Sequence, residues 1–190
     1  PLLAGHLSRL RRSADWLGFA LDEVALRGCL DAQPADGIWR VRVTLAKNGD
    51  FAAQCFPLVD EPVRLRYARL AAVPIDSGDP LRGHKTSERG VYDDALRSLP
   101  ADSAIFDVVF LNERGEVAEG ARSNVFVERD RQLLTPPLSC GALPGVLRAA
   151  LLASGEAREA VLWPEDLQQG FWLGNALRGL IPVYLESPTR

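Results

Sequence analysis

The sequence predicts an α+β (mixed α/β) fold in which strand pairs and helices are interspersed along both halves of the chain. Two observations support this prediction. "GIWRVRVTLA" alternates apolar and polar residues, as a half-buried strand does. "HLSRLRRSADWLGFALDE" instead spaces its apolar residues along one face of a helix. Strand pairs with interspersed helices are typical of the α+β and mixed α/β classes, in which helices cover a sheet.

The first part of the chain is expected to hold two helices and a strand pair. The helical pattern near the start is followed by "LDEVALRGCLDAQPADG", a second helix with Asp22 as its N-cap. "KNGD" then turns the strand at "GIWRVRVTLA" back on itself. A further strand is expected at "PVRLRYARLAAV". The chain begins with a helix almost at once, so we expect it to be trimmed at its front.

A cluster of Pro, Gly and Asp in "PIDSGDPLRG" marks the expected boundary between two parts. We place a smaller N-terminal α/β part at residues 1–78 and a larger C-terminal part at 83–190. The elements expected in the larger part, in order, are a helix at "ERGVYDDALRSL", a hairpin through "SAIFDVVFLNERGEVAEG", a hairpin turning at "RDR", a helix at "LPGVLRAALLASG", and closing strands at "EAVLW" and "FWLGNALRGLIPVYL" around a short helix at "PEDLQQG".

Composition excludes several function classes. The net charge is −3 with both signs interspersed, which does not indicate a nucleic-acid or anionic-membrane surface. No apolar run approaches the roughly 20 residues of a membrane span. The three cysteines lack metal-binding spacing, so we expect buried thiols, Cys140 among them, and no metal. A cytoplasmic location is the expectation from these features.

Four features suggest a common chemistry. An amine, Lys85, lies in a loop, and a carboxylate, Glu119, ends a strand. A helix start and a tight turn after a strand offer backbone N–H groups for an anion. An amine, a carboxylate and a phosphate cup are what pyridoxal 5'-phosphate (PLP) requires. The helix start is expected to offer the N–H groups of Gly145, Val146 and Leu147, and the turn is expected to offer those of Gly174, Asn175 and Ala176.

At this point the chain resembles the fold-type IV PLP enzymes, which include branched-chain and D-amino acid aminotransferases and aminodeoxychorismate lyase. The resemblance covers nearly all the chain, without the family's N-terminal strand pair. It is carried by "HLSRL", "HK" at 84–85, "VAEGARSNVF", "LPGVLR" and "GNALRGLIPV". It implies that Lys85 forms the Schiff base, that Glu119 holds the pyridine nitrogen, and that Arg9 binds the phosphate.

Each of these residues also has an ordinary structural interpretation. Lys85, Glu119 and Arg9 are types that usually lie on the solvated surface. Asn124 is either a site residue or the cap of a turn. Tyr92 is more typical of a core aromatic than of a cofactor contact. Lys47, in a turn where relatives often carry Arg, is a weak candidate for binding a substrate carboxylate.

The resemblance leaves the reaction open between two chemistries. "GNALRG" and the pattern K-T-x-x-R-x-x-Y-D from Lys85 to Asp93 favour a 4-amino-4-deoxychorismate lyase that yields 4-aminobenzoate and pyruvate for folate precursor synthesis. The second interpretation is a class IV aminotransferase acting on branched-chain or D-amino acids. A third is an inactive PLP-fold dimerisation module. The family implies a homodimer, and a lyase module could be fused to, or work with, aminodeoxychorismate synthase.

Overall fold

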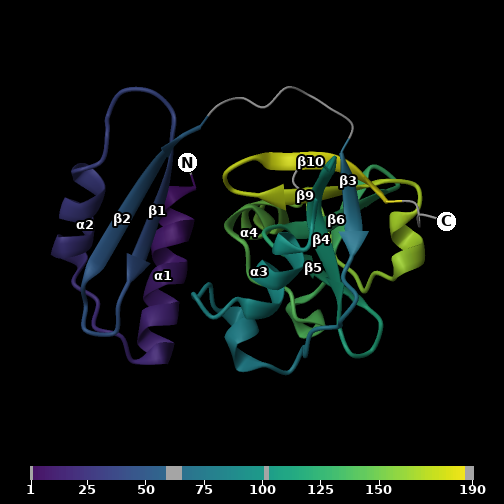
Figure 1. The fold of residues 1–190 in the computed structure, drawn as a ribbon, viewed down its shortest axis with the longest axis horizontal. Coiled ribbons are helices and arrows are strands. Elements are labelled where there is room, and N and C mark those ends of the chain that lie inside the picture. Colours follow the sequence, from purple (N-terminus) through teal and green to yellow (C-terminus); the bar gives the residue numbers. More distant parts are fainter. Residues whose placement is uncertain (1, 59–65, 101–102, 187–190) are drawn as a thin grey trace. The chain divides into compact units, whose positions relative to one another are not determined.

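A computed structural model describes residues 2–58, 66–100 and 103–186 (Figure 1). The chain divides into two compact units, Leu3–Val63 and Arg64–Arg190. This division falls earlier than the boundary expected at 78 to 83. The reason is that strand β3, Tyr67–Leu70, pairs in parallel with two strands of the second unit and so belongs to that unit's sheet.

The first unit contains two helices and one antiparallel hairpin, as the sequence predicts. Its elements are α1 (Leu3–Leu17), α2 (Glu23–Asp31), β1 (Trp39–Leu45) and β2 (Phe51–Pro57). Asp22 caps α2, because its carboxylate accepts hydrogen bonds from the N–H groups of Val24 at 2.8 Å and Ala25 at 3.1 Å. Gly49, with φ of 96°, allows the hairpin turn that "KNGD" predicts.

The second unit is built on one mixed, eight-stranded sheet with the order β5-β4-β3-β10-β9-β6-β7-β8 (Figure 1). Strand β3 runs parallel to β4 and β10, and β7 runs parallel to β8, while the other neighbours are antiparallel. The mixed α/β class is therefore confirmed. The remaining strands are β4 (Ile105–Leu111), β5 (Val117–Gly120), β6 (Asn124–Arg129), β7 (Gln132–Thr135), β8 (Ala157–Glu159), β9 (Phe171–Asn175) and β10 (Gly179–Leu185).

Both hairpins predicted in this unit are present. The second one turns at Asp130 and Arg131, which both have positive φ. The prediction of a strand at "EAVLW" is wrong beyond Glu159. That strand pairs with β7, and Pro136 directly after β7 has no N–H to continue the ladder.

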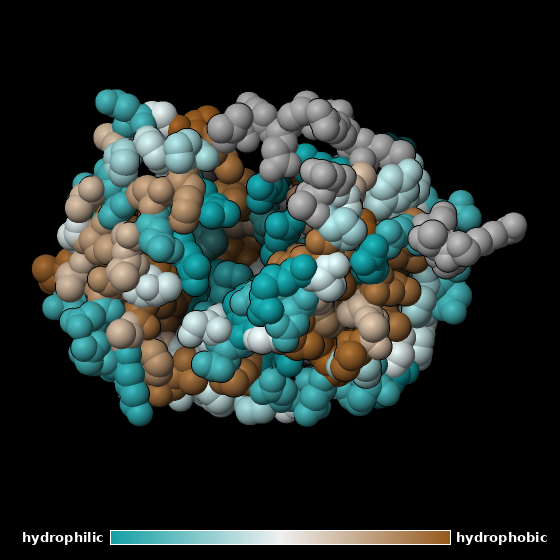
Figure 2. Space-filling model, viewed as in Figure 1, coloured by the Kyte–Doolittle hydropathy of each residue, from teal (hydrophilic) through white to brown (hydrophobic). Residues whose placement is uncertain are grey.

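The helices of the second unit are α3 (Gly90–Arg97) and α4 (Val146–Ala153), and three short 3₁₀ helices lie at Pro80–Gly83, Leu138–Cys140 and Pro164–Leu167. Helices were predicted at α3, α4 and Pro164–Leu167. No helix in the described part of the chain is long and apolar enough to cross a membrane. Figure 2 shows hydrophilic and hydrophobic residues interspersed on the visible face.

Two apolar clusters of the second unit position the candidate site. The larger contains fully buried side chains of the central strands, such as Val125, Leu134 and Leu173. Burial of each such side chain contributes about 1.5–3 kcal/mol. The smaller cluster joins Tyr92 of α3 to Phe110 of β4, with ring centroids 4.9 Å apart in an edge-to-face arrangement. This contact holds α3 against the sheet beside the end of β5.

Candidate functional site

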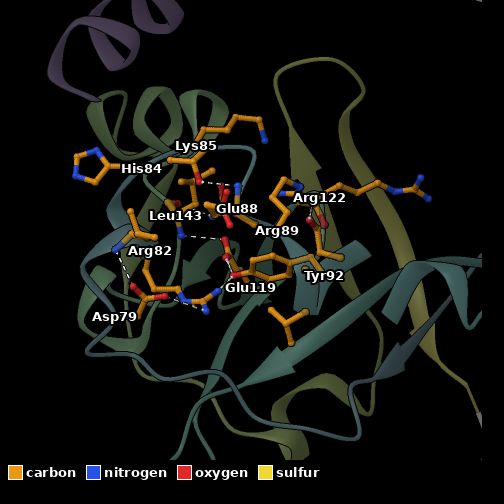
Figure 3. A pocket seen from close by; sticks show the side chains of 17 residues that line it. Asp79, Arg82, His84, Lys85, Glu88, Arg89, Tyr92, Glu119, Arg122 and Leu143 are labelled. Carbon is orange, nitrogen blue, oxygen red and sulfur yellow. Dashed lines mark hydrogen bonds and ion pairs between the residues drawn. The ribbon is translucent and has the colours of Figure 1, made fainter. Parts of the chain in front are cut away.

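One pocket of the second unit collects charged side chains from several elements (Figure 3). They come from the segment between Asp79 and Arg89, which includes the 3₁₀ helix Pro80–Gly83, from β5, and from the loop that follows β5. Both cationic and anionic side chains line it, so it suits a ligand that carries both signs. The charged or titratable lining residues are Asp79, Arg82, His84, Lys85, Glu88, Arg89, Glu119 and Arg122.

Glu119 is the buried carboxylate of this pocket and is only 6% exposed. The hairpin β4–β5 places it near the end of β5, opposite Phe110. Its Oε1 accepts a hydrogen bond from the Tyr92 hydroxyl, and its Oε2 accepts one from the Leu143 N–H at 2.9 Å. Burial raises the pKa of Glu119, while these two donors and the charges of Arg82 and Lys85 lower it. Burial is the largest of these influences, so the pKa of Glu119 is raised overall, and the two donors act against its protonation.

The loop after Glu119 is held by a second buried acid that the sequence analysis missed. Asp107 is fully buried in β4, and its carboxylate accepts hydrogen bonds from Ser123 Oγ at 2.6 Å and from the Arg122 N–H at 3.2 Å. A Cβ at Gly120 would lie 2.6 Å from Asp107 Oδ2, so glycine is required there. A lone Asp in the apolar strand "IFDVVFL" was the available signal.

Lys85 lies between the 3₁₀ helix Pro80–Gly83 and α3, in the loop where the sequence placed it. Asp79 begins this segment and caps the 3₁₀ helix, because its carboxylate accepts a hydrogen bond from the Leu81 N–H at 2.9 Å. Lys85 lines the same pocket as Glu119, and its charge lowers the pKa of Glu119. The structure thus brings together the amine and the carboxylate that the sequence analysis paired.

Asn124, at the start of β6, connects this pocket to the turn before α4. Its Nδ2 donates to the Leu143 carbonyl oxygen at 2.9 Å. Gly145 passes so close that a Cβ built on it would lie 2.0 Å from Asn124 Oδ1. Asn124 therefore positions the turn and does more than cap a local bend, and Gly145 has a steric reason to be glycine.

The predicted anion cup is the N-terminus of α4. Gly145 is its N-cap residue, and Val146 and Leu147 open the helix, where N–H groups have no intrahelical acceptor. These residues do not line the pocket of Figure 3 but join it through Asn124. Gly174 brings β9 close to this turn, since a Cβ there would lie 3.1 Å from Leu147 Cδ2.

Asn175 forms the second predicted donor turn, between β9 and β10. Its Oδ1 accepts hydrogen bonds from the N–H groups of Leu177 and Arg178, both at 3.0 Å, which shapes the turn around Ala176. Its Nδ2 donates to the Arg122 carbonyl oxygen at 3.2 Å and so ties this turn to the loop after Glu119.

Arg9 and Lys47 lie in the first unit, on α1 and in the turn between β1 and β2. A phosphate-binding role for Arg9 and a substrate contact for Lys47 therefore stay predictions. Cys140 is buried, and burial together with the neighbouring Glu116 raises its thiol pKa to about 11. A protonated, buried thiol suits the structural role predicted for it. The described residues contain no cluster of side chains suited to a metal ion.

The pocket also contains residues that the sequence analysis did not single out. Arg82 donates to the Tyr92 hydroxyl at 2.6 Å, and Arg89 donates to the Ala121 carbonyl oxygen at 2.6 Å. Arg89 and Tyr92 belong to the K-T-x-x-R-x-x-Y-D pattern. The structure shows that this pattern holds Glu119 and the loop after it.

These residues fit PLP. A buried carboxylate with two donors can face a protonated pyridine nitrogen, an amine lines the same pocket, and a helix N-terminus free of side-chain bulk at Gly145 can take the phosphate. The donor set is the one that this cofactor requires.

Comparison with known proteins agrees with this chemistry. The family described as amino-transferase class IV matches residues 1–185. A solved structure from Mesorhizobium loti, provisionally assigned as an amino-acid aminotransferase, is 41% identical, covers 98% of this chain and 92% of that chain, and has a TM-score of 0.87. The 4-amino-4-deoxychorismate lyase of Pseudomonas aeruginosa has the same fold, with a TM-score of 0.78 at 24% identity, over 98% of this chain and 78% of that chain.

Among curated proteins, one from Schizosaccharomyces pombe is provisionally assigned as an aminodeoxychorismate lyase. It is 29% identical over 89% of this chain and 76% of its own length. A Thermotoga maritima protein, provisionally assigned as a branched-chain-amino-acid aminotransferase, is 26% identical over 94% of this chain and 69% of its own length. The relatives therefore include both of the activities that the sequence analysis left open.

Proposed function

The chain belongs to the class IV aminotransferase family of PLP-dependent enzymes, and within it we propose that it is a 4-amino-4-deoxychorismate lyase. The products are 4-aminobenzoate and pyruvate. The atoms of the substrate are those of the two products, so the reaction needs no second substrate. The Schizosaccharomyces pombe relative provisionally assigned as a lyase, which is 29% identical, and the K-T-x-x-R-x-x-Y-D and "GNALRG" patterns favour this activity.

The observation that carries the proposal is the single pocket that holds both Lys85 and Glu119. Lys85 would bind the cofactor covalently and then, as a released amine, take a proton from the substrate and return one to it. Glu119 would keep the pyridine nitrogen protonated, and the amides of Val146 and Leu147, with those near Asn175 and Ala176, would hold the phosphate. The cofactor supplies an electron sink for the bond-breaking step.

An amino-acid aminotransferase is the alternative function. It is favoured by the Mesorhizobium loti structure, which is 41% identical to this chain. The same residues would serve it, with Lys85 moving a proton between the substrate and the cofactor. An aminotransferase, however, requires a 2-oxo acid as a second substrate, and this requirement separates the two functions in one assay.

The test is product analysis with purified protein, PLP and 4-amino-4-deoxychorismate, in the presence and absence of a branched-chain 2-oxo acid. We expect 4-aminobenzoate and pyruvate in equal amounts without any 2-oxo acid. Lys85→Ala protein is the matched control for non-enzymatic breakdown. Turnover that depends on the 2-oxo acid and yields an amino acid would reject the lyase and support the aminotransferase.

We further propose a homodimer in the cytoplasm, because members of this family typically form homodimers there. The protein would work beside aminodeoxychorismate synthase or be fused to it. Light scattering during gel filtration measures the mass directly, and a mass near the 20.8 kDa of one chain would reject the dimer. Visible absorbance from bound PLP would argue against an inactive dimerisation module.

A further inference from the structure

Three polar side chains form a directed chain of hydrogen bonds that ends at the Glu119 carboxylate (Figure 3). Arg82 Nη1 donates to the Tyr92 hydroxyl oxygen at 2.6 Å, and the Tyr92 hydroxyl donates to Glu119 Oε1. A guanidinium has donors only and is always charged. The Tyr92 oxygen therefore accepts from Arg82, and its single proton is directed to Glu119.

The state of Tyr92 fixes this direction. Burial raises the pKa of the Tyr92 hydroxyl, and the nearby Glu119 charge raises it further, so the hydroxyl keeps its proton. The ring is held on one side by its edge-to-face contact with Phe110. The guanidinium carbons of Arg82 and Arg89 each lie 5.2 Å from the ring centroid. Tyr92 is therefore fixed as a donor in one orientation.

Arg82 is fixed by the segment that also carries Lys85. Its guanidinium lies 3.3 Å from the Asp79 carboxylate, and Asp79 caps the 3₁₀ helix that contains Arg82. Lys85 follows three residues later. One short stretch of backbone thus supplies both the amine of the pocket and the charge at the far end of the hydrogen-bond chain.

A packing role alone does not require this chemistry. A phenylalanine at position 92 would keep the ring contacts with Phe110, and it would leave out a hydroxyl that must be desolvated and paired. Arg82, Tyr92 and Glu119 all line the pocket, so the chain ends where a ligand binds. Buried polar chains of this kind strengthen each bond along them and fix one arrangement.

We propose that Arg82 and Tyr92 are positioning residues that keep Glu119 ionised and directed at the pyridine nitrogen, and so keep that nitrogen protonated. This inference rests on the proposed role of Glu119 but not on the choice between lyase and aminotransferase. Glu119 is the group that touches the cofactor, and the other two residues act through it.

The experiment measures the nitrogen itself. The protein is reconstituted with PLP labelled with ¹⁵N in the pyridine ring, and the ¹⁵N chemical shift at neutral pH reports the fraction of rings whose nitrogen carries the proton. The variants are Tyr92→Phe, Arg82→Met and Glu119→Gln. Arg97→Met is the matched control, because Arg97 is an exposed arginine of α3 paired with Asp94 on the surface.

Without the Tyr92 hydroxyl or the Arg82 charge, Glu119 is a stronger base and competes with the ring nitrogen for the proton. We expect Tyr92→Phe and Arg82→Met each to shift this balance towards Glu119 by about tenfold, one pK unit, so that the ¹⁵N chemical shift at neutral pH moves towards that of an unprotonated ring. Glu119→Gln should move it most, and Arg97→Met should leave it unchanged. If Tyr92→Phe fails to fold, as judged by circular dichroism, Arg82→Met alone tests the proposal.

Two outcomes would overturn it. A ¹⁵N chemical shift equal to that of the wild type for both Tyr92→Phe and Arg82→Met, with a changed shift for Glu119→Gln, would make the chain structural only. An unchanged shift in Glu119→Gln would show that Glu119 does not face the nitrogen, which removes the basis of the inference. Product analysis scores the lyase activity separately, so the two proposals fail in different measurements.

Discussion

Replacing Gly145 with Ala should destabilise the protein although the backbone there can accept alanine. Gly145 has φ of −65° and ψ of 146°, an extended conformation open to any residue. The obstacle is Asn124, whose Oδ1 would lie 2.0 Å and Cγ 3.1 Å from the new Cβ. Asn124 must move by more than about 1 Å, which breaks its 2.9 Å hydrogen bond to the Leu143 carbonyl oxygen.

The expected cost combines two terms. Overpacking a well-filled site costs about 1–3 kcal/mol, and leaving a buried polar group unpaired costs about 1–3 kcal/mol. We therefore expect Gly145→Ala to lower the free energy of unfolding by roughly 2–6 kcal/mol. For a chain of this size the melting temperature should fall by about 4–24 °C. Urea unfolding and thermal melting, both followed by circular dichroism, measure these quantities.

The matched control is Gly90→Ala at the first residue of α3, where a Cβ meets nothing within 4 Å. We expect it to stay within about 0.5 kcal/mol of the wild type. In an Asn124→Ala background the clash is gone, so adding Gly145→Ala should cost little more, a coupling that a double-mutant cycle detects. Equal stabilities of Gly145→Ala and Gly90→Ala would refute the steric argument.

Three further predictions concern single charges. Lys85→Ala should lower turnover by about 10²–10⁴-fold, and a rate above about one tenth of the wild type contradicts its role. The control is Lys47→Ala, at the chain's other lysine. After borohydride reduction, mass spectrometry should still find PLP attached to the Lys47→Ala protein. Arg9→Ala should lose PLP on dialysis faster than the wild type, and equal retention measured by absorbance would remove Arg9 from the site. Hydrogen bonds from Arg114 and a neighbouring amide lower the pKa of Glu116 to about 2. The ionised Glu116 therefore stabilises the fold above its unfolded pKa of about 4.3, and this stabilisation is lost as pH falls. The free energy of unfolding of Glu116→Gln should depend less steeply on pH than that of the wild type between about pH 4.5 and pH 2. Equal slopes for the two proteins would contradict this.

Local rules were enough to predict most elements, because their signals lie in neighbouring residues. The Asp22 cap and the turn at Asp130 and Arg131 are of this kind, since each depends on a few positions in a row. The boundary between the two units has no such local signal. It depends on β3 pairing with β4 and β10, strands that lie far along the chain, and a Pro- and Gly-rich stretch carries no information on that pairing.

The candidate site shows the same division. Lys85 and Glu119 could be paired as candidates because their residue types and local settings match one chemistry, and the structure places both in the lining of one pocket. Arg82 and Asp107 act through partners that are distant in sequence: Arg82 reaches Tyr92, and Asp107 reaches Ser123. Their roles follow from the way α3 and the loop after β5 pack on the sheet. A residue whose function is to hold another residue has little signature of its own.

The three residues Leu143, Pro144 and Gly145 explain how the two ends of a PLP molecule could be held at one separation. The Leu143 N–H donates to Glu119, and its carbonyl oxygen accepts from Asn124. Gly145 then begins α4, and its N–H donates back to the Leu143 carbonyl oxygen at 2.7 Å across Pro144, whose φ is restricted by its ring. The carboxylate proposed to face the pyridine nitrogen and the turn proposed to bind the phosphate are thus joined by one short, stiff segment. A displacement at either end must move the other, so Gly145→Ala should weaken PLP binding as well as folding, while Gly90→Ala should change neither.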